Sequence, residues 1–336
     1  MADPLHPPAQ RAASTLPNRP GHPNARRAGG PAVQAPAERV ARGAAGRLSV
    51  CIGRLYRGPG DPTHRRVQDV WYRAATSPQG GLLLELRDSG TDVAARAWGP
   101  GRHWALEQLP RLLGCHDPAD FHPQHPLLAE LARRNPQLRV GATDLVCESL
   151  LPSVVEQKVT GAEAFRAIHR LTRRFAEPAP GPAGRAGHPA HGMRLPLTAA
   201  QWARIPSWDY LRAGVEQKRS ATVVGCARRG RALERTLGNE QADTALQSLP
   251  GIGPWTSART RQQAHGDADA WSIGDYHVPR AISHALCGEQ LDDDGCAELL
   301  EPFAGHRYRV ELLLGRAGMA VERHGARRSL PTHVGL

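Results

Sequence analysis

Several residue types and patterns are scarce or missing in this chain of 336 residues. Its six cysteines include no Cys-x-x-Cys pair, so the sequence predicts neither a zinc site nor a disulfide framework. No apolar run reaches the roughly 18 residues that span a bilayer, and the first residues lack the pattern typical of a signal peptide. We therefore expect a soluble, cytoplasmic protein.

Lysine is nearly absent, because Lys158 and Lys218 are the only lysines among the 43 basic residues. The formal net charge of +11 is typical of proteins with a polyanionic partner, such as DNA, RNA or an anionic membrane surface. A GC-rich genome also favours arginine without any functional cause. The charge alone therefore leaves a nucleic-acid partner and a compositional bias as alternatives.

Large apolar side chains are scarce in residues 1–46, which hold eight prolines before position 37. Such a segment buries too little surface to become ordered, so we predict a disordered tail rich in Pro, Ala and Arg. Its arginines either add weak DNA affinity or belong to a solvated linker. Residues 317–336 are predicted to form a C-terminal tail.

Short segments of β type begin at residue 48 and alternate with turn clusters rich in Gly, Pro and Asp. We expect strands at residues 48–52, 67–75, 81–87 and 91–98, and helices at residues 103–113 and 126–134. Residues 47–140 are therefore predicted to form a small antiparallel α+β domain.

The apolar spacing becomes helical from residue 142 onwards. Helices are expected at residues 198–205, 210–237 and 243–249, and a Pro, Gly and His-rich segment, 177–194, is predicted to be a flexible insertion. The expected fold class is α+β. A mostly α-helical domain, residues 141–316, is preceded by the small antiparallel β-sheet domain.

The most informative stretch runs from Leu249 to Ala258 and reads Leu-Pro-Gly-Ile-Gly-Pro-Trp-Thr-Ser-Ala. It predicts a helix end, a tight turn at Gly251 and Gly253, and a second helix start, with Ile252 tucked into the helix pair. Glycine permits φ > 0 and close approach of a phosphate, which the backbone N–H groups and the helix start attract. The alternative is an ordinary turn between helices with glycine caps.

This stretch and the segment Asp269–His277 together resemble the helix-hairpin-helix DNA glycosylase superfamily, and within it the DNA-3-methyladenine glycosylase II branch. In that family a catalytic aspartate follows the hairpin glycines by some twenty residues. Asp275 lies 22 positions after Gly253 and matches that aspartate. The resemblance covers about residues 48–315, including the N-terminal strands.

The segment Glu148–Thr160 resembles the first helix of the family's glycosylase domain. There a Gln and the next residue face the DNA, which implies that Gln157 contacts the substrate and Lys158 the DNA. Relatives place an apolar wedge where this chain has Lys158.

The resemblance implies excision of a base that has been flipped out of the duplex. The carboxylate of Asp275 is expected to oppose the positive charge that develops on the sugar and to position a water molecule; a helix N-cap is its compatible alternative. The rings of Trp255, Trp271 and Tyr276 are expected either to stack on a cationic alkylated purine or to fill the helical core. The expected contacts with the DNA backbone come from Gly251, Ile252, Gly253, Thr256, Lys158, Lys218 and Arg219.

Family members that also cut the strand use a lysine two positions after the last hairpin glycine, where this chain has Trp255. Only Cys287 and Cys296 follow Asp275, so no iron–sulfur cluster is expected. We predict a monofunctional N-glycosyl hydrolase for base excision repair of alkylated purines. We expect it to act on double-stranded DNA as a nucleoid-associated monomer without metal, cofactor or membrane partner. Alternatives are a non-catalytic helix-hairpin-helix DNA-binding protein, a glycosylase for another lesion class, a bifunctional glycosylase for oxidised bases, and an arginine-rich interaction protein.

Overall fold

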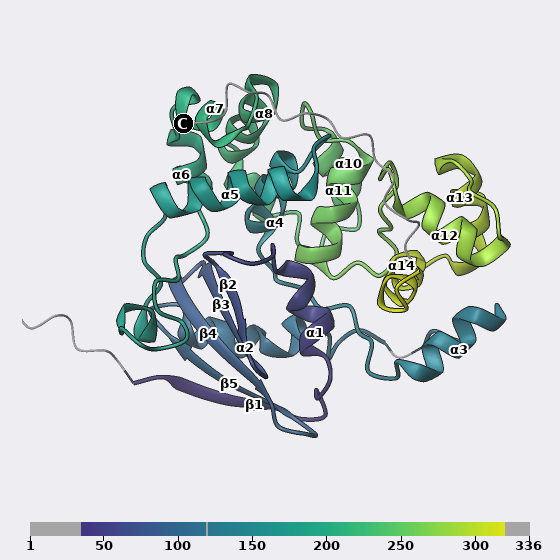
Figure 1. Cartoon of the computed structure of the whole chain (residues 1–336), viewed down its shortest axis with the longest axis horizontal. Coiled ribbons are helices and arrows are strands. Elements are labelled where there is room, and N and C mark those ends of the chain that lie inside the picture. Colours follow the sequence, from purple (N-terminus) through teal and green to yellow (C-terminus); the bar gives the residue numbers. More distant parts are fainter. Residues whose placement is uncertain (1–34, 119, 320–336) are drawn as a thin grey trace, which may run out of the picture. The chain divides into compact units, whose positions relative to one another are not determined.

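The computed structural model describes residues 35–118 and 120–319. Over these residues the chain forms an antiparallel sheet and a larger set of helices, which is an α+β fold (Figure 1). Residues 1–34 of the predicted N-terminal tail and residues 320–336 of the predicted C-terminal tail lie outside the described residues. No helix in the described part is long and apolar enough to cross a membrane.

The sheet has the strand order β1-β5-β4-β3-β2, and all neighbouring strands are antiparallel. Its strands are β1 (Ala37–Ala41), β2 (His64–Val67), β3 (Val70–Ser77), β4 (Gly80–Asp88) and β5 (Val93–Trp98). The prediction of a disordered tail is wrong for β1, because pairing with β5 orders a segment that has few large apolar side chains of its own.

The predicted strand at residues 48–52 is also wrong. Residues Leu48–Cys51 form helix α1. Leu48 and Ile52 lie one helical turn apart, and both are buried in the same core beneath the sheet. A short apolar run does not distinguish a strand from a buried helix, which explains the error.

Side chains alternate along the central strands, so the sheet buries both faces. Leu84 and Leu86 of β4 pack on one face against α1 and α2 (Arg102–Leu112). Leu83 belongs to the opposite face, where it is buried together with Tyr72 of β3. This second face needs a cover, which the chain supplies from a distant segment.

Residues 177–194 provide that cover and do not form the predicted flexible insertion. Pro178 and Arg194 pair as an isolated antiparallel bridge at the two ends of the segment. Met193 is fully buried in the cluster that contains Leu83. Apolar contacts with the sheet therefore order a segment whose Pro and Gly content is typical of a loose loop.

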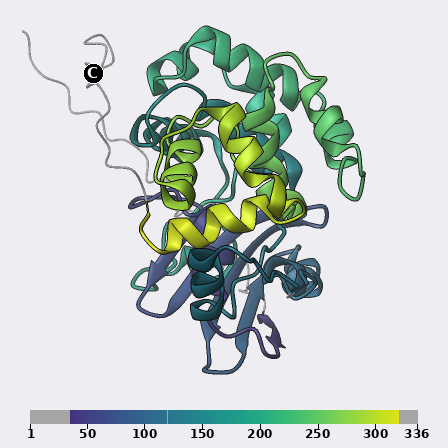
Figure 2. The same ribbon diagram turned by 90° about the vertical axis from the view of Figure 1, so that its right-hand side faces the viewer.

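The helices form two hydrophobic clusters. The first cluster contains side chains of α4 (Val146–Val155), α5 (Gly161–Phe175), α6 (Ala199–Arg204), α7 (Ser207–Ala213), α8 (Gln217–Ala227), α9 (Gly230–Glu234) and α10 (Ala242–Gln247). The second contains α3 (Pro126–Arg134), α12 (Val278–Cys287), α13 (Asp293–Leu300) and α14 (Arg307–Arg316), the end of the molecule seen in Figure 2. Helix α11 (Pro254–Thr260) continues into a π-helical turn, η3 (Arg261–His265), and residues 266–277 then lead to α12.

Two sequence expectations are corrected by this packing. Residues 210–237 do not form one helix, because Gly214 adopts a φ of +97° and ends α7. Helix α3, predicted within the N-terminal domain, buries Leu128 and Leu131 against Ile282 and Val310 of the second cluster. The domain boundaries at residues 47–140 and 141–316 remain a prediction.

Candidate active site

The predicted hairpin joins α10 to α11. Gly251 has a φ of +85°, and a Cβ there would lie 2.7 Å from Thr222 Oγ1 of α8, so backbone and packing both require glycine. Gly253 has a φ of −102°, and a Cβ on it would meet nothing within 4 Å. The expected positive φ is therefore confirmed for Gly251 and wrong for Gly253. Ile252 is buried in the first helical cluster, as expected.

The start of α11 has donors that the described chain leaves uncapped. No side chain among the described residues caps this helix. The carbonyl of Gly253 accepts the N–H of Ser257 at 3.0 Å, so the N–H groups of Trp255 and Thr256 precede the first intrahelical bond. The partial positive charge of a helix N-terminus lies at the same place. This end of the hairpin is therefore able to bind an anion.

Gln157 connects the end of α4 to the hairpin. Its Nε2 donates to the carbonyl of Gly251 at 3.0 Å and to Thr256 Oγ1 at 2.8 Å. The side chain of Thr256 is buried, whereas Lys158 is exposed and has a φ of +55°. The structure thus brings Gln157, Gly251 and Thr256 together and leaves Lys158 on the surface beside them.

Helix α8 contributes a second basic residue near the hairpin. Lys218 is exposed and lies one helical turn before Thr222, whose Oγ1 would lie 2.7 Å from a Cβ on Gly251. Arg219 is only 8% exposed, and its Nη1 donates to the carbonyl of Val155 at 2.7 Å. The predicted DNA contact of Arg219 is therefore corrected, because its guanidinium binds the backbone of α4.

Asp275 lies in the loop before α12 and is half-buried. Its Oδ1 accepts the N–H groups of His277 at 2.8 Å and Val278 at 3.1 Å, at the first turn of α12. Its Oδ2 accepts the indole Nε1–H of Trp255 at 3.1 Å. The helix has His277 as its N-cap residue, so Asp275 supports the helix start from two positions earlier. The same carboxylate joins this loop to the hairpin helix.

The three aromatic rings proposed from the sequence have different surroundings. Trp255 is half-buried beside Asp275, and Tyr276 is 62% exposed. The guanidinium of Arg280 lies 4.5 Å from the centre of the Tyr276 ring. Trp271 is only 7% exposed and packs in the second helical cluster, which favours the core alternative over stacking on a base for this ring.

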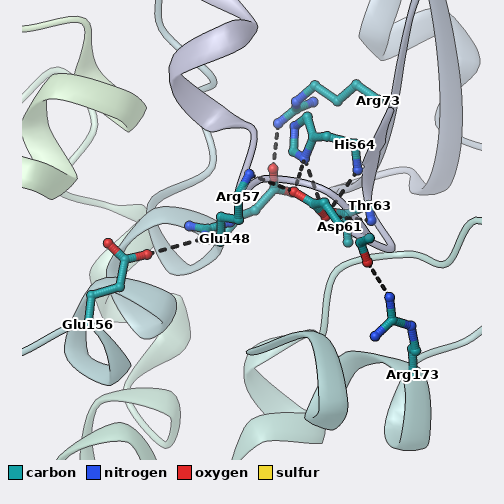
Figure 3. Close-up of polar contacts among 9 residues, drawn as sticks. Arg57, Asp61, Thr63, His64, Arg73, Glu148, Glu156 and Arg173 are labelled. Atoms are coloured by element: carbon teal, nitrogen blue, oxygen red, sulfur yellow. Dashed lines mark hydrogen bonds and ion pairs between the residues drawn. The ribbon is translucent and has the colours of Figure 1, made fainter. Parts of the chain in front are cut away.

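A second polar group, which we call the interior cluster, lies between the sheet and the helices (Figure 3). It consists of the buried residues Asp61, His64 and Arg73 and the partly buried Glu148. Arg73 of β3 donates to Glu148 of α4, and Asp61 accepts the backbone N–H groups of Thr63 and His64. Burial lowers the pKa of His64 to about 3, so its ring is neutral at neutral pH. Burial also raises the pKa of Glu148.

The cavity beside the interior cluster has a volume of about 30 Å³. Such a volume holds roughly one water molecule, whereas pockets for small organic ligands measure several hundred Å³. Within the described ranges, no group of three or more His, Cys, Asp or Glu side chains is arranged to hold a metal ion. The interior cluster is therefore too confined to receive a base.

The motifs in the sequence did not predict two charged residues near Asp275. Arg280 lies in the first turn of α12, and Glu311 of α14 accepts hydrogen bonds from the N–H and the Oγ–H of Ser272 at 2.8 and 2.9 Å. In the sequence, Glu311 could have been noticed only as a lone carboxylate in the apolar run Val310–Leu314.

The fold resembles solved structures of DNA glycosylases. The 3-methyladenine DNA glycosylase of Archaeoglobus fulgidus matches with a TM-score of 0.69 and 19% identity, over 84% of this chain and 98% of that chain. The 8-oxoguanine glycosylase/lyase of Clostridium acetobutylicum, bound to double-stranded DNA containing cytosine opposite 8-oxoguanine, matches with a TM-score of 0.62 and 12% identity, over 85% of this chain and 99% of that chain.

The sequence matches no protein-family model and no curated protein. At these identities the structural matches show the fold, and they span nearly the whole of both glycosylases. The chain therefore has the fold of the helix-hairpin-helix DNA glycosylases.

Proposed function

We propose that this chain is a monofunctional DNA glycosylase that releases a damaged base by hydrolysis and leaves an abasic site. The observation that carries the proposal is the half-buried Asp275 carboxylate, held by the Trp255 indole and by two backbone N–H groups directly beyond the hairpin. Its fixed negative charge opposes the positive charge that develops on the sugar as the glycosidic bond breaks. The same carboxylate orients the attacking water.

The hairpin is the proposed grip on the DNA backbone. Support comes from the uncapped start of α11 and from the open space beside Gly253, which lets a phosphate approach the main chain. Lys158 and Lys218 are exposed on the two segments that contact the hairpin, so their charges strengthen the same grip. Gln157 acts here by holding Gly251, rather than by contacting the base.

Water is the proposed nucleophile. Trp255 occupies the hairpin position at which strand-cutting relatives have a lysine, and its indole binds Asp275 instead. Lys158 follows Gln157, the residue that binds the hairpin carbonyl of Gly251. A Schiff base between Lys158 and the sugar would show that the lysine, and not water, is the nucleophile.

The proposed substrate is an alkylated purine of the 3-methyladenine type, for which Trp255 and Tyr276 supply electron-rich rings near Asp275. One observation favours another lesion class. The Arg280 guanidinium already lies against the Tyr276 ring, and its charge repels a second cation there. A neutral damaged base, such as 8-oxoguanine, is therefore the second candidate.

A substrate panel tests the proposal. Duplexes of one sequence would carry 7-methylguanine, 8-oxoguanine or no lesion, and free base would be measured by chromatography. We expect release of the methylated purine and none from the undamaged duplex. Release of 8-oxoguanine alone would move the substrate to the neutral class, and binding without any release would favour a non-catalytic DNA-binding protein.

A further inference from the structure

Glu311 is a half-buried carboxylate beside the Asp275 loop that the proposed mechanism does not use. It lies on α14 and faces Ser272. Its Oε2 accepts the N–H of Ser272 at 2.8 Å, and its Oε1 accepts the Oγ–H of the same residue at 2.9 Å. Both oxygens of one carboxyl group therefore bind a single loop residue.

Ser272 connects Glu311 to the rest of the site. The carbonyl of Ser272 accepts the N–H of Asp275 at 3.2 Å. Its Oγ accepts a hydrogen bond from Gln262 Nε2 at 3.0 Å, and Gln262 Oε1 accepts one from Arg259 Nη1 at 3.1 Å. A shift of Ser272 therefore moves the backbone that carries the Asp275 carboxylate.

The charged and titratable groups around Glu311 come from three elements: Arg259 on α11, Asp275 in the loop and Cys296 on α13. Burial raises the pKa of Glu311 to about 7; the Ser272 hydrogen bonds and Arg259 oppose the rise, and the charge of Asp275 adds to it. Burial raises the pKa of the Cys296 thiol to about 12, so this group stays neutral. Ionised Glu311 accepts both Ser272 bonds, whereas the protonated acid has to donate one O–H.

We propose that Glu311 is a positioning residue for Asp275, which fixes the turn between Ser272 and Asp275 and holds it best when Glu311 is ionised. The expected effect of Glu311 on base release rests on the proposed function, whereas its expected effect on the position of the Asp275 turn does not. Base release is then expected to rise several-fold as the pH increases through neutrality.

The Trp255 indole N–H, which binds Asp275, reports this coupling without DNA. The full chain would be isotope-labelled, and its Trp255 indole signal identified by its loss in Trp255→Phe. We expect the signal in the wild-type protein to shift with a midpoint near pH 7 and the shift to disappear in Glu311→Gln. Glu298→Gln, at an exposed carboxylate of α13, is the matched control and should keep it. Absence of this midpoint in the wild-type protein, or its persistence in Glu311→Gln, would overturn the proposal.

Base release tests the catalytic part. Glu311→Gln keeps the shape of the side chain but, like the protonated acid, accepts only one of the two Ser272 bonds. We therefore expect its rate to match the low-pH rate of the wild-type protein and to lose the rise with pH. Glu311→Leu should lower kcat at least about tenfold with little change in KM, because the loop loses its anchor. A wild-type kcat in Glu311→Leu would contradict the positioning role. If the wild-type protein released no base, the proposed function would fail, and the indole titration would still decide the role of Glu311.

Discussion

The interior cluster and the Asp275 site both hold carboxylates fixed by nitrogen donors, yet their surroundings differ. In the interior cluster, Arg73 is 2% exposed and His64 is 4% exposed, and the charge of Arg73 lies directly against that of Glu148. At the Asp275 site, a half-buried carboxylate lies next to Tyr276, which is 62% exposed. The charges of the interior cluster are therefore paired with one another inside the protein, whereas the Asp275 site is accessible from solvent.

This difference separates charges that hold the fold from a charge that is able to meet a substrate. The lowered pKa of His64 is a large departure from the ordinary value, and such departures often mark functional sites. The cavity there has room for about one water molecule, so that rule misleads for this cluster. Access from outside, rather than the size of a pKa shift, is what favours Asp275 as the proposed catalytic group.

The largest effect is expected for Asp275→Asn, which keeps the shape of the side chain and removes its charge. Base release should fall by about three orders of magnitude or more, because the fixed negative charge opposite the sugar is lost. Binding to abasic-site DNA should change little. Single-turnover excision and binding titrations would measure the two effects.

Asp293→Asn is the control for Asp275→Asn. Asp293 accepts the N–H of Gly274 at 3.0 Å, so it supports the same loop without being the proposed catalytic group. Its rate should stay within about tenfold of the wild-type rate. Equal losses in the two variants would indicate that the loop geometry, and not the Asp275 charge, is responsible.

Arg73→Met, in the interior cluster, should lower the stability of the fold and leave DNA binding unchanged. It leaves the partly buried Glu148 carboxylate without its cation, which costs about 3 kcal/mol of unfolding free energy, whereas the folded protein should bind DNA normally. Urea denaturation and DNA titration at low temperature would measure both. Arg96→Met, which removes an exposed ion pair with Glu38 on the same sheet, should cost less than about 1 kcal/mol. A selective loss of DNA affinity in Arg73→Met would break the distinction between the two regions.

The two regions should also respond to pH with opposite signs. His64 has its pKa lowered from 6.5 to about 3, so its contribution to stability is present above pH 6.5 and is lost as the pH falls towards 3. Glu311 has its pKa raised from 4.5 to about 7, so its contribution is present below pH 4.5 and is lost as the pH rises through 7.

When the pH is lowered from 7 to 5, the unfolding free energy of His64→Asn should therefore rise by about 2 kcal/mol relative to that of the wild-type protein. The unfolding free energy of Glu311→Gln should fall by a similar amount relative to that of the wild-type protein. Denaturant melts at the two pH values would measure this. Changes of the same sign in both variants would refute the contrast.

The smallest effect is expected for Gly253→Ala. The φ of −102° suits alanine and the added Cβ meets open space, so stability should not change. Affinity for duplex DNA should fall about tenfold, or about 1.4 kcal/mol, whatever the sequence, because the methyl group obstructs the approach of a phosphate. Gly225→Ala, also in open space but in the last turn of α8, should leave affinity unchanged. An unchanged affinity in Gly253→Ala would remove Gly253 from the proposed grip.

The sequence predicted the features that depend on local pattern. Short segments of β type between turn clusters predicted strands close to β3, β4 and β5, and helix α3 occurs at the predicted residues, Pro126–Arg134. The hairpin motif predicted the left-handed Gly251, and motif spacing identified Asp275 as the catalytic candidate.

The remaining features depend on contacts between residues far apart in the chain. Strand β1 is ordered by pairing with β5, and residues 177–194 are ordered by the face of the sheet that they cover. Trp271 and Arg219 were candidates for base stacking and DNA contact because of their places in the sequence, but packing against neighbouring residues buries both side chains. Glu311 lies 36 residues after Asp275, and only folding brings its carboxyl group to Ser272.

Product analysis on a duplex with a single alkylated purine tests the central claim most directly. The wild-type chain would be incubated with this duplex, with and without borohydride, and free base, strand length and covalent adduct would be measured in one sample. We expect free base, a strand that breaks only after alkali, and no adduct, because Asp275 directs water and Trp255 replaces the lysine. An intact base would contradict the assignment to alkylated purines, and a borohydride-trapped adduct lost in Lys158→Ala would contradict hydrolysis by water.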